Sequence, residues 1–325
     1  MLRAINANHF PAVRYIHAKA WDAASIRAIL CFIVFLASIQ TNAQAIENFL
    51  KPSDTLNKKR RTAVYLSQAA ISGFTLSALY TTWYANYPQT NFHLKNDNTH
   101  WHQLDKIGHF YSAYHLGNLG ANSLSWSGAS KKEQLYYGAT LGWAFLSVVE
   151  IFDGFSSQWG ASYGDILANT AGTGLYIFQE SVWKEQRITP KFSVHTTKYA
   201  PLRPNTLGNS FSEQILKDYN GQTYWLSFNI HSFFNNNYIP KWLNVAVGYG
   251  ANGMLYATDK EALKNSYQQN SYKQYFLSLD IDLSKIKTNS QTLSTLFSIF
   301  NTIKVPLPTL KITENKVIKG HLFYF

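Results

Sequence analysis

The spacing of apolar residues changes once along the chain, at Thr189-Pro190, and this change constrains the fold more than any other feature. Before it, long segments with few charges carry apolar and small residues at intervals of three and four, which is typical of helices. After it, apolar and polar residues alternate, which is typical of strands. A run of helices followed by a run of strands predicts the α+β class.

About four helices are expected in the first part. Their predicted ranges are Ala63–Tyr84, Leu104–Ser125, Lys131–Phe152 and Tyr163–Trp183. Ser130 and Glu133 form a capping-box pattern at the start of the third helix, and Ser162 with Asp165 repeats it at the fourth. Small residues recur at helical spacing, so we expect the helix backbones to approach closely. The first helix is expected to pack on its neighbours or on a membrane surface, and spanning a bilayer is the alternative.

The second part is expected to be rich in antiparallel strands. Alternation is clear at 224–231, 243–250 and 275–283, and weaker at 192–198, 303–310 and 317–325. Leu293–Phe300 fits either a helix or a strand. The strands predict a sheet packed on the helices or on a membrane, or else a small outer-membrane barrel whose apolar face meets lipid. The terminal Phe325 on an aromatic segment resembles the signal read during assembly of such barrels.

Composition limits the class of protein and its partners. Only 14% of the 325 residues are charged and 16% are aromatic, which argues against a disordered chain. The mean hydropathy of −0.20 argues against a transporter built from long apolar helices. From Ser181 onward, sixteen Lys and Arg stand against eight Asp and Glu. This excess is either a solvated basic surface or a contact with membrane lipid or lipopolysaccharide. The sequence has no stripe of Lys and Arg interleaved with aromatic residues, so nothing in it suggests nucleic-acid binding.

The N-terminal region has the layout of an export signal. Arg27 precedes the apolar run Ile29–Ile39, and small residues follow at 41–45. Residues 1–43 are therefore predicted to be a signal peptide cleaved near Ala43, or a retained N-terminal anchor. The single cysteine, Cys31, lies inside the apolar run, so a cleaved chain would use neither disulfides nor thiol chemistry. The remaining predicted parts are a basic connector at 44–62, a helical bundle at 63–188 and a β-rich domain at 189–325.

A set of polar residues stands out in the otherwise apolar helices. Each of the last three helices carries a short polar face, and its members are Asp105, Lys106, His109, Glu150, Asp153, Asp165 and Asn169. Residues three or four apart share a helix face. Isolated buried charges are costly and paired charges are less so, and the three faces are therefore expected to meet inside the bundle.

These residues fit both structural and chemical roles. Structurally, Asp165 could serve its capping box, Asp105 the helix dipole, and Lys106 a buried bridge to Glu150. Chemically, one histidine with several carboxylates suits a divalent metal, with His109, Glu150, Asp153 and Asp165 as candidate ligands, although no cofactor is predicted outright. Alternatively, Asp105 would orient His109 as a general base. The chain lacks the His-Glu-x-x-His and Gly-x-Ser-x-Gly motifs that would identify a reaction.

The motif order supports a family resemblance. Asp105–Phe110, Glu150–Asp153 and Asp165–Gly172 resemble domain of unknown function 2279 (DUF2279), a family of predicted periplasmic lipoproteins. The same order is more distantly similar to VanZ-like membrane proteins, which carry Gln at the position of Asp153. The resemblance covers about residues 100–180, and the segment Lys217–Ser227 looks like the long, envelope-associated form of the first family. It implies an envelope protein that shares the seven polar residues listed above.

Together these observations predict an exported bacterial protein of the outer membrane or periplasm. A structural or binding role with a buried polar cluster is preferred. The alternative is an envelope enzyme that acts on a lipid or cell-wall precursor through His109 and the nearby carboxylates. The sequence identifies neither a substrate nor a partner protein.

Overall fold

The computed structural model describes residues 43–325 except residue 86. The predicted signal or anchor therefore lies outside the described residues, apart from Ala43, where helix α2 (Ala43–Leu50) begins. This helix occupies the first part of the predicted connector. Residues from Leu50 onward form one compact unit, which is described below.

The four predicted helices are present, with ends shifted by a few residues. Helix α3 (Lys58–Leu79) continues into the π-helical turn η2 (Tyr80–Tyr84), and α4 spans Leu104–Trp126. The third predicted helix is divided into α5 (Lys131–Glu133), the π-helical turn η4 (Gln134–Gly138) and α6 (Leu141–Phe155). The fourth is α7 (Tyr163–Val182). Both predicted serine caps are confirmed, since Ser130 accepts from the Glu133 amide and Ser162 from the Asp165 amide.

Small residues bring α4 into backbone contact with its neighbours. A Cβ atom added to Gly172 of α7 would lie 2.1 Å from the Phe110 carbonyl oxygen of α4. A Cβ atom added to Gly142 of α6 would lie 2.2 Å from the Ala113 carbonyl oxygen of α4. Both distances are far below a van der Waals contact, so these positions require glycine. The predicted close approach of the helices is confirmed.

Six antiparallel strands form the main sheet in the order in which they occur along the chain. They are β3 (Ile188–Val194), β4 (Gln222–Asn229), β5 (Leu243–Asn252), β6 (Tyr272–Ile281), β7 (Thr309–Thr313) and β8 (Ile318–His321). Within the described residues β3 and β8 are not paired with each other, and the other edge of β3 forms only a single bridge, between Phe192 and Ile303. No closed barrel is found in this part of the chain, so the alternative of a small barrel is not supported. The α+β class is confirmed.

Shorter elements complete the unit. Two-residue strands β1 (Leu94–Lys95) and β2 (Ala161–Ser162) pair in parallel and join the segment before α4 to the start of α7. Helix α12 covers Gln291–Phe300, which settles the segment whose pattern fitted two structures. The remaining short helices are η3 (His100–Gln103), η5 (Ala200–Leu202), α8 (Pro204–Leu207), α9 (Phe211–Lys217), η6 (Tyr219–Gly221), α10 (Ile230–Phe234), α11 (Asp259–Lys264) and η7 (Leu283–Lys285).

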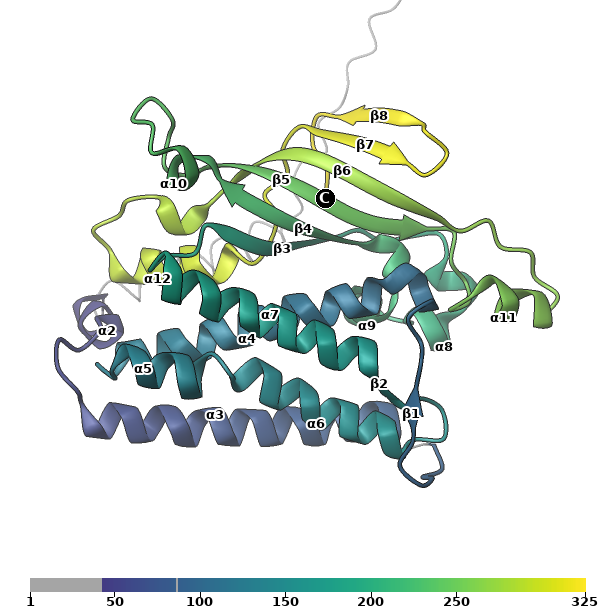
Figure 1. Ribbon diagram of the computed structural model, residues 1–325, viewed down its shortest axis with the longest axis horizontal. Helices are drawn as coiled ribbons and strands as arrows, with labels where there is room; N and C mark the ends of the chain where they lie inside the picture. The colour runs from purple at the N-terminus through teal and green to yellow at the C-terminus, as the bar shows by residue number, and fades with distance from the viewer. Residues whose placement is uncertain (1–42, 86) are drawn as a thin grey trace, which may run out of the picture. The chain divides into compact units, whose positions relative to one another are not determined.

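The elements are arranged in layers (Figure 1). Helices α4 and α7 lie between the sheet and the outer helices α3 and α6. Tyr111 of α4 contacts the rings of Phe192 on β3 and Tyr224 on β4, so the helices cover the sheet near its first two strands. The polar residues of α4, α6 and α7 therefore lie within the helical layers.

Polar and apolar side chains are distributed over the two faces of the sheet in the reverse of the usual arrangement, because the polar face is buried and much of the apolar face is exposed. The face that we call the inner face is buried and largely polar, with Lys191, Ser227 and Asp280 fully buried beside Trp225 and Phe276. Tyr324, near the end of the chain, packs on both aromatic rings. The face that we call the outer face is the apolar one. The register places Phe192 and Tyr224 on it, so Tyr111 of α4 covers it at β3 and β4. On β5, β6 and β7 this face carries apolar side chains that are 40–49% exposed: Val247, Tyr275, Leu277, Leu279, Leu310 and Ile312.

One helical stretch in the described part of the chain is long and apolar enough to cross a membrane, judged by length and composition. It is Lys131–Phe155, with a mean hydropathy of 1.3 over its most apolar window. The predicted candidate for spanning, Ala63–Tyr84, does not meet this criterion.

Candidate functional site

The polar residues predicted from the sequence converge from three helices. Asp105, Lys106 and His109 lie on the first two turns of α4, Glu150 and Asp153 near the end of α6, and Asp165 and Asn169 on the first two turns of α7. The structure adds one residue that the sequence did not indicate, Asp97. It lies in the loop before α4, where no periodic pattern marks a residue as buried.

Lys106 is the centre of one half of the cluster. Its Nζ atom lies 2.7 Å from Asp97 Oδ1, 2.9 Å from Asp105 Oδ2 and 2.9 Å from Asp165 Oδ2. The Lys106 side chain is only 10% exposed, so its charge lies in a poorly solvated site. The three carboxylates compensate that charge. These contacts replace the predicted bridge between Lys106 and Glu150.

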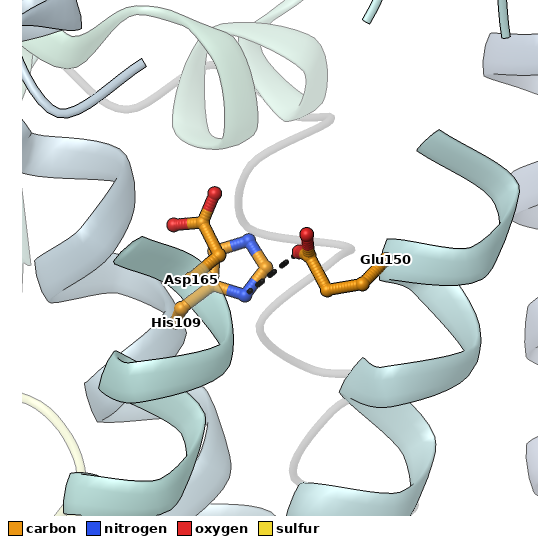
Figure 2. A group of neighbouring side chains, drawn as sticks. All are labelled: His109, Glu150 and Asp165. Carbon is orange, nitrogen blue, oxygen red and sulfur yellow. Dashed lines mark ion pairs between the residues drawn. The ribbon is translucent and has the colours of Figure 1, made fainter. Parts of the chain in front are cut away.

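His109 and Glu150 form the other half of the cluster (Figure 2). His109 Nδ1 lies 3.8 Å from Glu150 Oε1 and 3.1 Å from Asn169 Oδ1. The Ser162 amide donates to Glu150 Oε2 at 2.9 Å, which ties the end of α6 to the start of α7. Asn169, rather than the predicted Asp105, is therefore the hydrogen-bond partner that holds the His109 ring.

Asp153 is separate from this half. Its Oδ1 atom accepts a hydrogen bond from the Tyr84 hydroxyl at 2.9 Å, and this contact joins α6 to the turn that ends α3. Three of the four predicted metal ligands, His109, Glu150 and Asp165, do come together, with one ligand atom from each within 4.8 Å of the others. Asp153 is not part of that group.

Burial controls the protonation of these carboxyl groups. Loss of solvent raises the pKa of Asp105 to about 6, and the nearby Lys106 only partly offsets that effect. Burial also raises the pKa of Glu150 to about 7 and the pKa of Asp153 to about 7. Burial alone would lower the pKa of Lys106, but Asp105 and Asp165 raise it overall, so this lysine stays charged.

A second buried charge cluster lies on the inner face of the sheet. Lys191 Nζ lies 2.8 Å from Asp280 Oδ2, and both side chains are fully buried. The Ser227 hydroxyl donates to the same carboxylate at 2.6 Å, and Lys304 Nζ lies 3.7 Å from its other oxygen. The sequence did not indicate this cluster, because Asp280 occupies a polar position in a strand whose polar side resembles a solvent-facing side.

One of three comparisons with known proteins, the comparison with protein families, agrees with the prediction of an envelope protein. No curated protein and no solved structure matches the chain. The family comparison supports the first resemblance and gives no support to the more distant one to VanZ-like proteins. The matched segment runs from the first residue of β1 to the last turn of α7, so it contains the whole of the helical polar cluster. Residues 94–181 of this chain match DUF2279, the family described as predicted periplasmic lipoprotein, and that description is consistent with a location in the cell envelope.

Proposed function

We propose that the chain is a membrane-associated envelope protein with a structural or binding role, and that the outer face of its sheet lies against lipid. The observation that carries this proposal is the distribution of side chains over the two faces of the sheet. Leu277 and Leu279 of β6 are 48% and 45% exposed, while Ser278 and Asp280 between and beside them are buried. An antiparallel sheet in water normally buries its apolar face and exposes its polar one.

The register places the exposed apolar residues together. Val247 of β5 pairs with Leu277 of β6, and Leu277 in turn pairs with Leu310 of β7. Tyr275 and Ile312 form the next pair along the same face. Neighbouring cross-strand residues of one face make a continuous apolar surface, and surfaces of this kind mark interaction sites for proteins, ligands or membranes.

A cavity of about 540 Å³ opens on this apolar surface. Its lining includes Val245, Leu277, Leu279, Leu310 and Leu322. An apolar lining of this size is suited to a hydrocarbon chain. This supports lipid rather than a polar ligand as the occupant of the face.

The helices add further apolar surface. On α3 the side chains of Leu66, Ile71 and Phe74 are 65–77% exposed, and Leu167 of α7 is 70% exposed. Transfer of a half-exposed apolar side chain from water to lipid is favourable by about 1 kcal/mol, so the six residues of the outer sheet face together offer about 6 kcal/mol. The excess of Lys and Arg after Ser181 favours anionic lipid, either phospholipid or lipopolysaccharide.

Flotation of the full chain with vesicles tests the proposal. We expect the parent to float with vesicles of phosphatidylethanolamine and phosphatidylglycerol, and to remain bound in high salt because the contact is apolar. The Leu277→Glu/Leu279→Glu variant should lose most of this binding. A matched control, Gln268→Glu/Asn270→Asp, adds the same charge at exposed positions before β6 and should float like the parent.

The same experiment can overturn the proposal. Parent, variant and control all contain the apolar run Ile29–Ile39, so a difference between them isolates the sheet. If the parent does not float, or if a folded Leu277→Glu/Leu279→Glu variant floats as well as the parent, the outer face is not the lipid contact. Circular dichroism establishes that the variant is folded.

An envelope enzyme acting through His109 is the second candidate. The observation in its favour is that the His109 side chain is 20% exposed, whereas Glu150 and Asp165 beside it are 4% and 8% exposed. His109 is therefore the member of this group most accessible to a substrate. A folded His109→Asn variant that lacks an activity of the parent on a lipid-linked precursor would support this function.

A further inference from the structure

We propose that His109, Glu150 and Asp165 bind one divalent transition-metal ion, such as Zn²⁺ or Mn²⁺, between α4, α6 and α7. This site is independent of the lipid contact proposed above. The three residues come from three different helices, and one ligand atom from each lies within 4.8 Å of the other two. Figure 2 shows the Glu150 carboxylate directed toward the His109 ring.

The first argument is that polar atoms at this place have no partner. Glu150 Oε1, Asp165 Oδ1 and Asn169 Nδ2 are buried and form no hydrogen bond with any part of the chain that the structure describes. Glu150, Asp165 and Asn169 as whole residues are 3%, 5% and 0% exposed. Buried polar atoms in folded proteins are almost always paired, so unpaired oxygens on two carboxylates call for a ligand.

The second argument is a comparison with the neighbouring half of the cluster. There, three carboxylates, those of Asp97, Asp105 and Asp165, also approach closely, and Lys106 Nζ lies among them as their cation. Lys106 takes one oxygen of Asp165, Oδ2, and leaves Oδ1 unpaired. On the side of His109, no lysine or arginine of the described residues forms an ion pair with Glu150.

The third argument is the set of contacts around the three residues. The amide of Ser162 holds Glu150 Oε2, Lys106 holds Asp165 Oδ2, and Asn169 Oδ1 lies 3.1 Å from His109 Nδ1. Contacts of this kind orient metal ligands in proteins and leave the remaining atoms free to coordinate. A preformed arrangement of this kind lowers the cost of binding an ion.

The donor atoms define the class of metal. One imidazole nitrogen with two carboxylate oxygens suits a borderline divalent ion rather than a soft thiolate-binding one. Because Asn169 Oδ1 accepts the Nδ1 proton of His109, Nε2 is the nitrogen that can bind the ion. Ligand atoms around a tetrahedral ion lie ~3.4 Å apart for bond lengths near 2.1 Å, so the three side chains, whose ligand atoms lie within 4.8 Å of one another, must close slightly around it. Three protein ligands leave a further coordination position, and the partly exposed His109 provides the route to solvent.

Titration of the untagged full chain with metal tests the site. After treatment with a chelator, the parent should bind Zn²⁺ or Mn²⁺ with a stoichiometry of about one by isothermal titration calorimetry, and Co²⁺ should give the absorption spectrum of a nitrogen- and oxygen-ligated ion. Glu150→Gln keeps the shape and the contact with Ser162 but loses the charge, and should weaken binding about 10-fold or more. Asp153→Asn, three residues along α6 and bonded to Tyr84, is the matched control and should bind like the parent.

Two results would overturn the metal site. The absence of saturable one-to-one binding to the parent would overturn the site, and this measurement does not depend on any variant being folded. Equal binding by a folded Glu150→Gln variant and the parent would also overturn it. The titration uses no lipid, so its failure is a separate result from a failure of the flotation experiment.

Discussion

Lys106 Nζ lies 2.9 Å from Asp165 Oδ2, and this ion pair joins the first turn of α4 to the first turn of α7. Lys106 also contacts Asp97 in the preceding loop and Asp105 beside it on the same helix. One lysine thus fixes two helices and a loop. Because the two side chains are only 10% and 8% exposed, water does not compete for their charged groups, and the ion pair holds the two helices in a defined register.

Replacement of Lys106 should destabilise the protein strongly. Lys106→Met would leave three carboxylates in a buried site without their cation, and we expect the free energy of unfolding to fall by about 3–5 kcal/mol. Urea unfolding followed by circular dichroism measures this change. The matched control is Lys132→Met, at an exposed position on α5, which should change the stability by less than about 0.5 kcal/mol. Equal stability of the two variants would show that the cluster does not fix the helices.

Two glycines of α7 should respond to alanine in opposite ways. A Cβ atom at Gly172 would collide with the Phe110 carbonyl oxygen, whereas nothing lies within 4 Å of a Cβ atom at Gly174. Gly172→Ala should therefore lower the stability by about 1–3 kcal/mol because the helices must separate. Gly174→Ala should raise it by about 0.5–1 kcal/mol, because alanine favours a helix over glycine. Thermal unfolding of both variants tests the close packing of α4 and α7, and a Gly172→Ala variant as stable as the parent would contradict it.

His115 should make the protein sensitive to acid. Its Nε2 atom donates to the Pro190 carbonyl oxygen at 2.7 Å, and its Nδ1 atom is buried with no partner among the described residues. Burial lowers the pKa of His115 to about 4, below its ordinary value near 6.5. The folded state therefore prefers the neutral ring, so this contribution to stability is complete above pH 6.5 and is lost as the pH falls toward 4.

The measurement compares the parent with His115→Gln, which has no group that titrates in this range. Between pH 7 and pH 4 the parent should lose about 3 kcal/mol more than the variant in the free energy of unfolding. Urea titrations at several pH values provide the comparison. If parent and variant lose stability in parallel, the ring of His115 is solvated and the contact with Pro190 is not a buried connection.

The sequence predicted the helices well because local signals and packing signals agree there. The two serine caps mark where α5 and α7 begin, and small residues such as Gly142 and Gly172 mark where helices touch. The polar residues were also identified, because a charge in an apolar helix is conspicuous. Their pairing was not, since Lys106 contacts Asp97 from a loop that has no periodic pattern, instead of Glu150.

The sheet illustrates a different limit. Alternation identifies the residues that share a face, but it does not decide which of the two faces is buried. In β6 the pattern grouped Leu277 with Leu279 and Ser278 with Asp280 correctly. The structure buries the polar pair, because Lys191 and Lys304 from other segments supply the charges that Asp280 needs. Partners so distant in sequence leave no local signal.

The most direct test of the lipid contact measures the surroundings of Leu279 on vesicle-bound protein. A nitroxide label on Leu279→Cys, in a Cys31→Ser background, reports collisions with oxygen, which is concentrated in lipid, and with a water-soluble nickel complex. The same label on Gln268→Cys in the exposed loop is the control. We predict that oxygen dominates at position 279 and the nickel complex at position 268. Dominance of the nickel complex at both positions would contradict a lipid-facing sheet.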